Sequence, residues 1–341
     1  MPYANPALPR RANPLVLPLT GVLLVTGGLF LLAWLGWTLV QPAPPLYRYV
    51  LDTRGEAGDF PELKPEGFET LPVSRYRLMT EGIDEPLARA YVTDSPDSRP
   101  VLLHWDNRVA APLLYTSTAP AELKAVADTL AAHETDSAGV LGWWDVLQRL
   151  EAFTRQQYRF GETLLEPLLI PSHWQPRSGD IAALERSFWR VPGAGTEDAG
   201  FSSFTEALLA GEDEAAERLL QLTGSDTVTL VLHVSDIYKL GMLYPGRLSV
   251  GYKDFPNTGD MHGLIQRVKD WLQSEGYSNY LVENRGAEVV RVYFLTDEKS
   301  TRTLIAKLLP FSKAGPIHLE HFELVYQQGG FWVYQLTPVP G

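Results

Sequence analysis

The sequence contains no cysteine among its 341 residues. This absence excludes disulfide bonds, thiolate zinc sites, iron–sulfur clusters and covalent haem attachment through a C-x-x-C-H motif. A chain without disulfides depends on its hydrophobic core for stability, and a chain of this length can bury a large one. We expect no bound cofactor.

Familiar catalytic and nucleotide-binding motifs are also missing. The chain has no G-x-x-x-x-G-K-[ST], no G-x-S-x-G and no H-E-x-x-H, and "GAGTEDAG" lacks the G-x-G-x-x-G spacing. Carboxylates are plentiful, but their spacing assigns no pair to acid and base roles. The sequence therefore favours a non-catalytic protein, although it leaves enzymatic activity open.

Histidine is scarce, with seven in the chain. Only "HLEHFE" has ligand-like spacing, because His318 and His321 would share one face of a helix. The segment has the pattern of a strand, where the two rings would point to opposite faces. We therefore expect no metal site.

Basic residues are fewer than acidic ones: 29 Lys and Arg stand against 41 Asp and Glu, and the net charge is −12. Two of the basic residues, Arg10 and Arg11, lie at the N-terminus, so the rest of the chain is more acidic still. This balance argues against nucleic acid and anionic lipid headgroups as partners and permits docking with a basic protein.

One long segment has no charge at all, from Leu15 to Val40. As a helix rising about 1.5 Å per residue, it is long enough for the roughly 30 Å hydrocarbon core of a bilayer. Arg10 and Arg11 precede it, so the positive-inside rule places 1–14 in the cytoplasm and the rest of the chain in the periplasm. A signal peptide is the alternative, but its apolar core is normally only about 7–15 residues long. We expect an uncleaved single-pass anchor in the inner membrane.

The remainder predicts a stalk and a folded domain. Residues 41–73 are rich in Pro, Gly and Glu and predict a stalk with little structure. Residues 74–341 predict a mixed α/β domain of short strands and helices that ends in antiparallel hairpins, the last one turning at Gly329-Gly330. Two lobes with a boundary near 225–255 remain an open alternative.

A Trp-Trp-Asp motif occupies Trp143, Trp144 and Asp145, where a short strand pattern gives way to a helix pattern. Alternation along a strand would send one indole into the core and the other to the opposite face, with Asp145 as the helix cap. The functional alternative places the outward Trp and Asp145 at the C-terminal end of a strand, where α/β folds hold ligands. The structural interpretation is favoured, because core burial and capping are common for these residue types.

Two further candidates complete a possible binding surface. Asp236 and Lys239 follow the strand "TVTLVLH", a position suited to a ligand's polar group but more typical of a solvated turn. His173 and Trp174 lie in the Pro-rich stretch "IPSHWQP", where a loop packed by its own aromatic ring is favoured over a functional loop.

Several segments resemble the hydroxylamine oxidation protein HaoB family: "GWWDVLQRLEAFT", "LLEPLLIPSHW", "RVYFLTDEKSTRTLIAKLLPF" and "LVYQQGGFWVYQL". Members of that family are encoded beside the multihaem hydroxylamine oxidoreductase in ammonia-oxidising and some methane-oxidising bacteria. The resemblance covers most of the chain and carries over no catalytic residues. It implies a membrane-anchored periplasmic accessory protein that tethers or helps to assemble that oxidoreductase during nitrification.

A second, local resemblance concerns "VLGWWD", "FTEALLAGEDEAAERLLQLTG" and "TVTLVLHVSDIYKLG". Their order is similar to that in the extracytoplasmic domain of single-subunit oligosaccharyltransferases, where a Trp-Trp-Asp motif recognises the acceptor peptide. Trp143, Trp144 and Asp145 match that motif, and Asp236 and Lys239 match a later Asp/Lys motif only loosely. The polytopic region that carries catalysis in those enzymes has no counterpart here. The resemblance implies, as the alternative function, a relative of glycosyl- or peptide-transfer enzymes or a peptide-binding protein.

Overall fold

The computed structural model describes most of the chain. The described residues are 16–40, 45–107, 118–133, 136–160, 172–190, 199–225, 227–257, 259–285, 289–311 and 319–336. The chain divides into two compact units, Met1–Pro45 and Leu46–Gly341, and each is described by itself.

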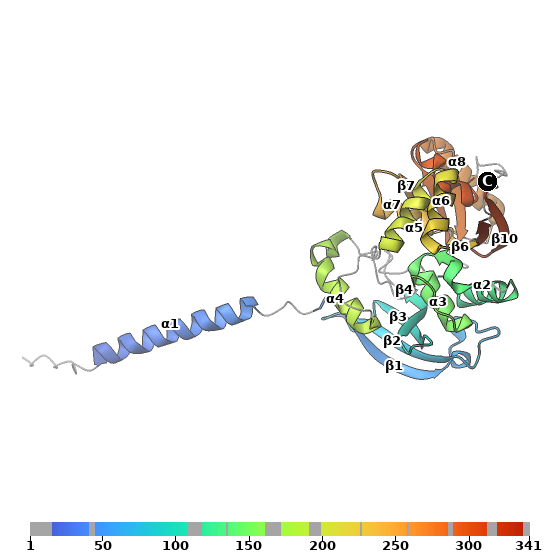
Figure 1. Cartoon of the computed structure of the whole chain (residues 1–341). Coiled ribbons are helices and arrows are strands. Elements are labelled where there is room, and N and C mark those ends of the chain that lie inside the picture. The colour runs from blue at the N-terminus through green and yellow to red at the C-terminus, as the bar shows by residue number, and fades with distance from the viewer. Residues whose placement is uncertain are drawn as a thin grey trace, which may run out of the picture. The chain divides into compact units, whose positions relative to one another are not determined.

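The first unit contains one long helix, α1 (Val16–Val40), seen in blue in Figure 1. It has 25 residues and no charged side chain. Between Val22 and Trp37 its large apolar side chains are exposed, from 54% at Leu35 to 76% at Leu24. By length and composition the helix can cross a membrane, within Gly21–Thr38. The predicted apolar helix is therefore confirmed.

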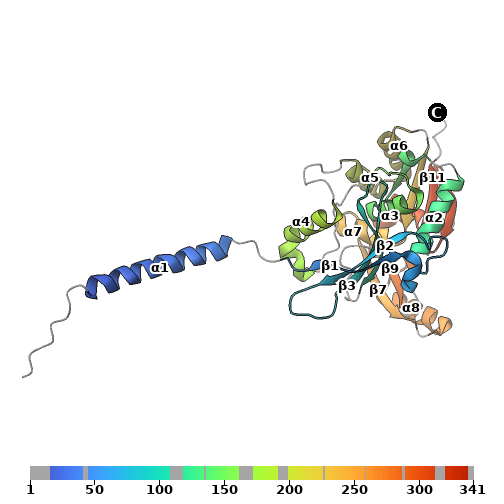
Figure 2. The ribbon, with the colours of Figure 1, turned by 90° about the horizontal axis from the view of Figure 1, so that it is seen from below.

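The second unit begins with an antiparallel meander of four strands, called here the meander sheet. Figure 2 shows β1, β2 and β3 from below. The strands follow chain order: β1 (Arg48–Glu56), β2 (Pro72–Met79), β3 (Ala88–Asp94) and β4 (Pro100–Asn107).

A mixed sheet brings together segments from distant parts of the chain. Its order is β10 (Phe322–Gln328), β11 (Phe331–Leu336), β6 (Val228–His233) and β5 (Val140–Gly142). β5 and β6 are parallel, and the other pairs are antiparallel. Every residue of β6 is buried, as its β-branched and aliphatic sequence predicts. Because this sheet includes strands from both sides of the suggested lobe boundary near 225–255, Leu46–Gly341 forms one unit.

A three-stranded antiparallel sheet carries its own small core against one helix. Its order is β7 (Val250–Pro256), β9 (Val289–Leu295) and β8 (Tyr280–Asn284). Helix α8 (Met261–Glu275) buries Leu264, Val268 and Leu272 in that core, as its 3.6-residue spacing predicts. Asp260 caps its first turn and Gly276, at φ 76°, ends it.

The remaining helices complete a mixed α/β fold, and the predicted fold class is confirmed. The α-helices are α2 (Pro120–Ala132), α3 (Trp144–Thr154), α4 (Ser178–Trp189), α5 (Ala199–Leu209), α6 (Glu212–Thr223), α7 (Asp236–Leu243) and α9 (Leu304–Leu308). The 3-10 turns are η1 (Ala57–Asp59), η2 (Pro61–Leu63), η3 (Ser137–Gly139), η4 (Ser172–Arg177) and η5 (Ser300–Arg302). One large core cluster takes residues from the meander sheet, the mixed sheet and the helices around them.

The predicted stalk over 41–73 is wrong from β1 onwards. β1 pairs along its length with β2, and 57–71 fold back in short turns. Its apolar side chains enter a separate core cluster that includes Phe60, Leu63, Phe68 and Leu71. The Pro, Gly and Glu content of this segment led to the prediction of a stalk. Its apolar residues are widely spaced, and each is buried separately.

Candidate functional site

The Trp-Trp-Asp motif lies at the junction of β5 and α3. Trp143 is the extended N-cap residue and Trp144 is the first residue of the helix. Both indoles are 1% exposed, so neither is the surface Trp of the functional interpretation. Strand alternation does not apply, because β5 ends at Gly142 before the first indole. A Cβ on Gly142 would lie 2.7 Å from the Val231 carbonyl oxygen, so this close approach of the strands requires glycine.

Asp145 lies in the first turn of α3 and is not the N-cap residue, so its predicted capping role is wrong. Its side chain is 3% exposed. Oδ1 accepts a hydrogen bond of 2.9 Å from Lys239 Nζ, which belongs to α7. The motif's carboxylate therefore joins two helices.

Asp236 and Lys239 are buried at 0% and 3% exposure, so the expected solvated turn is also wrong. Asp236 Oδ1 lies 3.0 Å from Lys239 Nζ, and Asp236 Oδ2 accepts a bond of 2.8 Å from the His233 backbone N–H. β5 and β6 are parallel, so the helices that follow them start at the same edge of the mixed sheet. This topology brings Asp145 and Asp236 to a single ammonium group.

Arg149 is a fourth member that sequence reasoning missed. It lies one helical turn after Asp145, and Nη2 is 3.5 Å from Asp145 Oδ2. Its Nη1 donates to Thr118 Oγ1, and the side chain is 2% exposed. The i, i+4 spacing of an acid and a base on a helix was the available signal.

We call Asp145, Arg149, Asp236 and Lys239 the ion cluster. Two carboxylates balance one ammonium and one guanidinium, and Lys239 Nζ also lies 5.2 Å from the centre of the Trp143 ring. Burial raises the pKa of Asp236, and the charge of Lys239 opposes that rise. Both carboxylates are already paired with cationic side chains. The cluster fixes α3 against α7.

His233 extends the polar interior beyond the ion cluster. Its Nδ1 lies 2.7 Å from Ser235 Oγ, and its Nε2 lies 4.0 Å from Glu283 Oε1. Burial lowers the pKa of His233 well below its usual value, and the charges of Lys239 and Arg149 lower it further. The imidazole is therefore neutral at pH 7, with Ser235 at one ring nitrogen and Glu283 near the other.

The other predicted pair lies outside the ion cluster. His173 is exposed, and Trp174 stacks on Tyr47 with 5.5 Å between ring centroids. Tyr47 in turn donates a 2.6 Å hydrogen bond to Glu185 on α4. His173 and Trp174 thus pack beside a different buried group.

Glu185 is fully buried. Among the contacts that the structure describes, all of its hydrogen-bond donors are neutral groups. They come from Tyr47 Oη, Tyr49 Oη and Trp189 Nε1. Burial raises the pKa of Glu185 from its usual 4.5 to about 7, although the three donors oppose the rise. No sequence pattern marked this carboxylate.

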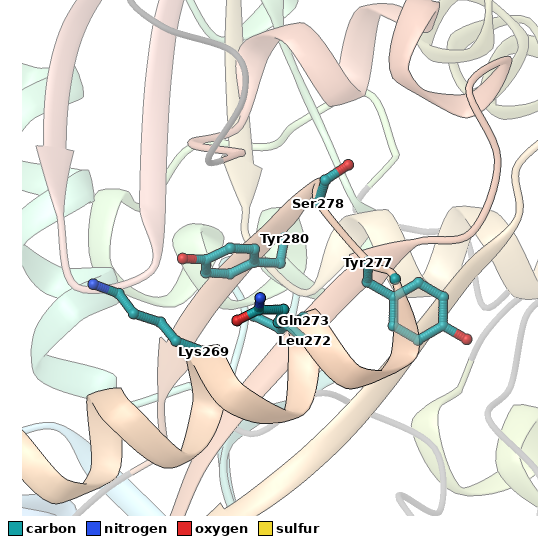
Figure 3. A pocket seen from close by; sticks show the side chains of 7 residues that line it. Lys269, Leu272, Gln273, Tyr277, Ser278 and Tyr280 are labelled. Atoms are coloured by element: carbon teal, nitrogen blue, oxygen red, sulfur yellow. The ribbon is translucent and has the colours of Figure 1, made fainter.

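An open pocket of about 360 Å³, lined by none of these groups, lies between the end of α8 and the start of β8. Figure 3 shows the rings of Tyr277 and Tyr280 on either side of Leu272 and Gln273. It holds one cationic group, Lys269, and no carboxylate, so it offers no acid and base pair.

Residues 13–336 match a family model described as HaoA-associated protein HaoB. Neither the curated proteins nor the solved structures contain a match. The match covers α1 and the folded unit together, and it agrees with the resemblance seen in the sequence.

Proposed function

The chain belongs to the HaoA-associated protein HaoB family, and on that basis we propose that it is a non-catalytic accessory of hydroxylamine oxidation. In this proposal it holds the multihaem hydroxylamine oxidoreductase, HaoA, at the periplasmic face of the inner membrane. The observation that carries the proposal is the extent of the family match, which runs through α1 as well as the domain. The apolar helix is thus a feature of the family rather than an addition to this chain.

The properties of α1 support a membrane anchor. Its window Gly21–Thr38 has a mean hydropathy of 1.7 and is not buried in the protein. Apolar surface of this extent is favourable in a bilayer and unfavourable in water, at about 25 cal/mol per Å². Arg10 and Arg11 before the helix favour a cytoplasmic N-terminus and a periplasmic domain.

The ion cluster supports a role without catalysis. Its charged groups neutralise one another, and each is 3% exposed or less. A peptide could reach Trp143, Trp144 or Asp145 only by opening the core. This burial disfavours the alternative function, in which the Trp-Trp-Asp motif binds or modifies a peptide.

The acidic character of the chain supports a partner with a basic surface. Long-range attraction between opposite charges raises association rates and weakens as salt screens it. We therefore expect the interaction with the oxidoreductase to be strongest at low ionic strength.

The test replaces α1 with a cleaved export signal in cells that produce the oxidoreductase. We expect the oxidoreductase to move from the membrane fraction to the soluble fraction while its total haem content is unchanged. Replacement of α1 by an unrelated single-pass helix of the same orientation is the matched control and should restore the membrane fraction. A loss of total haem enzyme would indicate assembly instead of tethering. An unchanged distribution, together with no co-purification at low salt, contradicts the proposal.

A further inference from the structure

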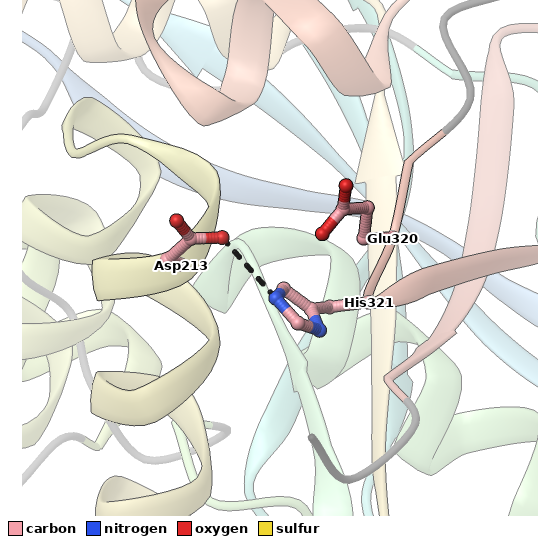
Figure 4. A group of neighbouring side chains, drawn as sticks. All are labelled: Asp213, Glu320 and His321. Atoms are coloured by element: carbon pink, nitrogen blue, oxygen red, sulfur yellow. Dashed lines mark hydrogen bonds and ion pairs between the residues drawn. The ribbon is translucent and has the colours of Figure 1, made fainter. Parts of the chain in front are cut away.

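Three potential metal ligands meet where α6 begins and the chain enters β10. Asp213 lies in the first turn of α6, and Glu320 and His321 directly precede β10. Their ligand atoms all lie within 4.8 Å of one another. Figure 4 shows the His321 ring turned towards Asp213, with Nε2 at 3.2 Å from Oδ1.

The imidazole is held in place, whereas the two carboxylates can adjust. Glu212 Oε1 accepts hydrogen bonds from the backbone N–H groups of Glu320, at 2.6 Å, and His321, at 3.2 Å. His321 is only 7% exposed. The Asp213 side chain is 86% exposed, and Glu320 is exposed as well, so both can rotate at little cost. The imidazole is fixed and the two carboxylates are mobile, so a small movement of the carboxylates can bring all three ligand atoms around one ion.

The distances suit a transition-metal ion. Bonds of about 2.0–2.2 Å to nitrogen and oxygen place tetrahedral ligand atoms roughly 3.4 Å apart. The His321–Asp213 pair is already close to that separation, and a rotation of Glu320 brings in the third ligand. Attraction to the helix N-terminus accounts for the acids in the first turn of α6. It does not account for a buried imidazole turned towards them, nor for Glu320 from another segment.

We propose that Asp213, Glu320 and His321 bind one divalent transition-metal ion. An imidazole with two carboxylates suits Zn²⁺ and its neighbours in the first row, whereas Mg²⁺ and Ca²⁺ prefer oxygen ligands alone. Three protein ligands leave a fourth position for water or for a donor from another molecule. The bound ion links α6 to the edge strand β10. This site is independent of the proposed function.

The test uses the full chain in detergent, without a polyhistidine tag, after removal of metal with a chelator that is then dialysed away. Titration with Zn²⁺ by calorimetry, and with Co²⁺ by visible absorption, should give one saturable equivalent with a tetrahedral cobalt spectrum. His321→Gln and the double variant Asp213→Asn/Glu320→Gln should each weaken binding at least about tenfold. Glu217→Gln, an exposed acid on α6, and His262→Gln, an exposed histidine on α8, are the matched controls and should bind as the parent does.

The double variant keeps the test decisive, because its two acids are exposed and their loss leaves the core intact. We expect Zn²⁺ to raise the melting temperature of the parent and of Glu217→Gln but not that of the double variant. Absence of a saturable equivalent, or equal affinity in the parent and the double variant, overturns the proposal.

Discussion

Lys239 Nζ lies 2.9 Å from Asp145 Oδ1, although 94 residues separate them in the chain. The pair exists because β5 and β6 are parallel and the helices that follow them start at one edge of the mixed sheet. Asp236 completes the arrangement from the first turn of α7. A motif that resembles a peptide-recognition element is thus part of the interior.

We predict that Asp145→Asn destabilises the protein by about 3–5 kcal/mol, because it leaves buried Lys239 and Arg149 short of a counter-charge. Denaturant unfolding of the full chain in detergent measures this loss. Asp128→Asn breaks an exposed pair with Lys124 on α2 and should cost only about 0.3–0.5 kcal/mol. If Asp145→Asn kept full stability and yet lost the oxidoreductase in pull-downs, Asp145 would be an interface residue.

Gly330→Ala should destabilise the protein by about 1–3 kcal/mol through overpacking. A Cβ at this position would lie 2.1 Å from His233 Nε2, and the His233 ring is buried. Thermal unfolding checks this expectation. Gly246→Ala is the control, since nothing lies within 4 Å of its Cβ position, and equal melting temperatures for the two variants would refute the overpacking argument.

Glu185 should make the protein less stable as the pH rises from about 4.5 to about 7. Its pKa is raised in the folded state, so the folded protein binds a proton that the unfolded chain releases at lower pH. The stability is fully present below pH 4.5 and is lost as the pH passes through 7, by about 3 kcal/mol.

Glu185→Gln provides the measurement, because it keeps an acceptor for Tyr47 and removes the titration. The free energy of unfolding of Glu185→Gln, minus that of the parent, should increase between pH 4.5 and 7. Glu217→Gln, on the surface of α6, serves as the control and should follow the parent at every pH. Parallel curves for Glu185→Gln and the parent would show that Glu185 does not titrate in this range.

Two arginines in the middle of α1 should abolish membrane retention. Each Arg at the centre of a membrane helix costs about 2.5–3.5 kcal/mol on insertion scales, so Leu29→Arg with Leu32→Arg opposes insertion strongly. Alkaline carbonate extraction measures the fraction retained in the membrane. Leu29→Ala with Leu32→Ala keeps the segment uncharged and should be retained. Retention of the double arginine variant would mean that α1 does not hold the protein in the bilayer.

The sequence predicted those elements whose cause is local. The Gly329-Gly330 hairpin depends on neighbouring residues, and the structure confirms it. The period and caps of α8 are local in the same sense. Helix α1 was predicted from its apolar, uncharged composition, which is also a local property of the chain. The strand β1 was missed because its pairing with β2 and the burial of the residues after it are tertiary effects.

Sequence reasoning named Asp145, Asp236 and Lys239 of the ion cluster, but it missed Arg149 and the arrangement of the four residues. Residues at 143–145, 236 and 239 do come together, yet neither their burial nor their mutual pairing follows from spacing along the chain. His321 illustrates the same limit, because its nearby acid, Asp213, is 108 residues away. His318, its expected companion, lies outside the described residues.

The early start of β1 limits how far the domain can travel from α1. From Val40 to Leu46 the chain can extend over only about 20 Å, whereas a stalk over all of 41–73 could have stretched to roughly 110 Å. The connection between the anchor proposed for α1 and the folded unit is therefore a short length of chain and not an extended stalk.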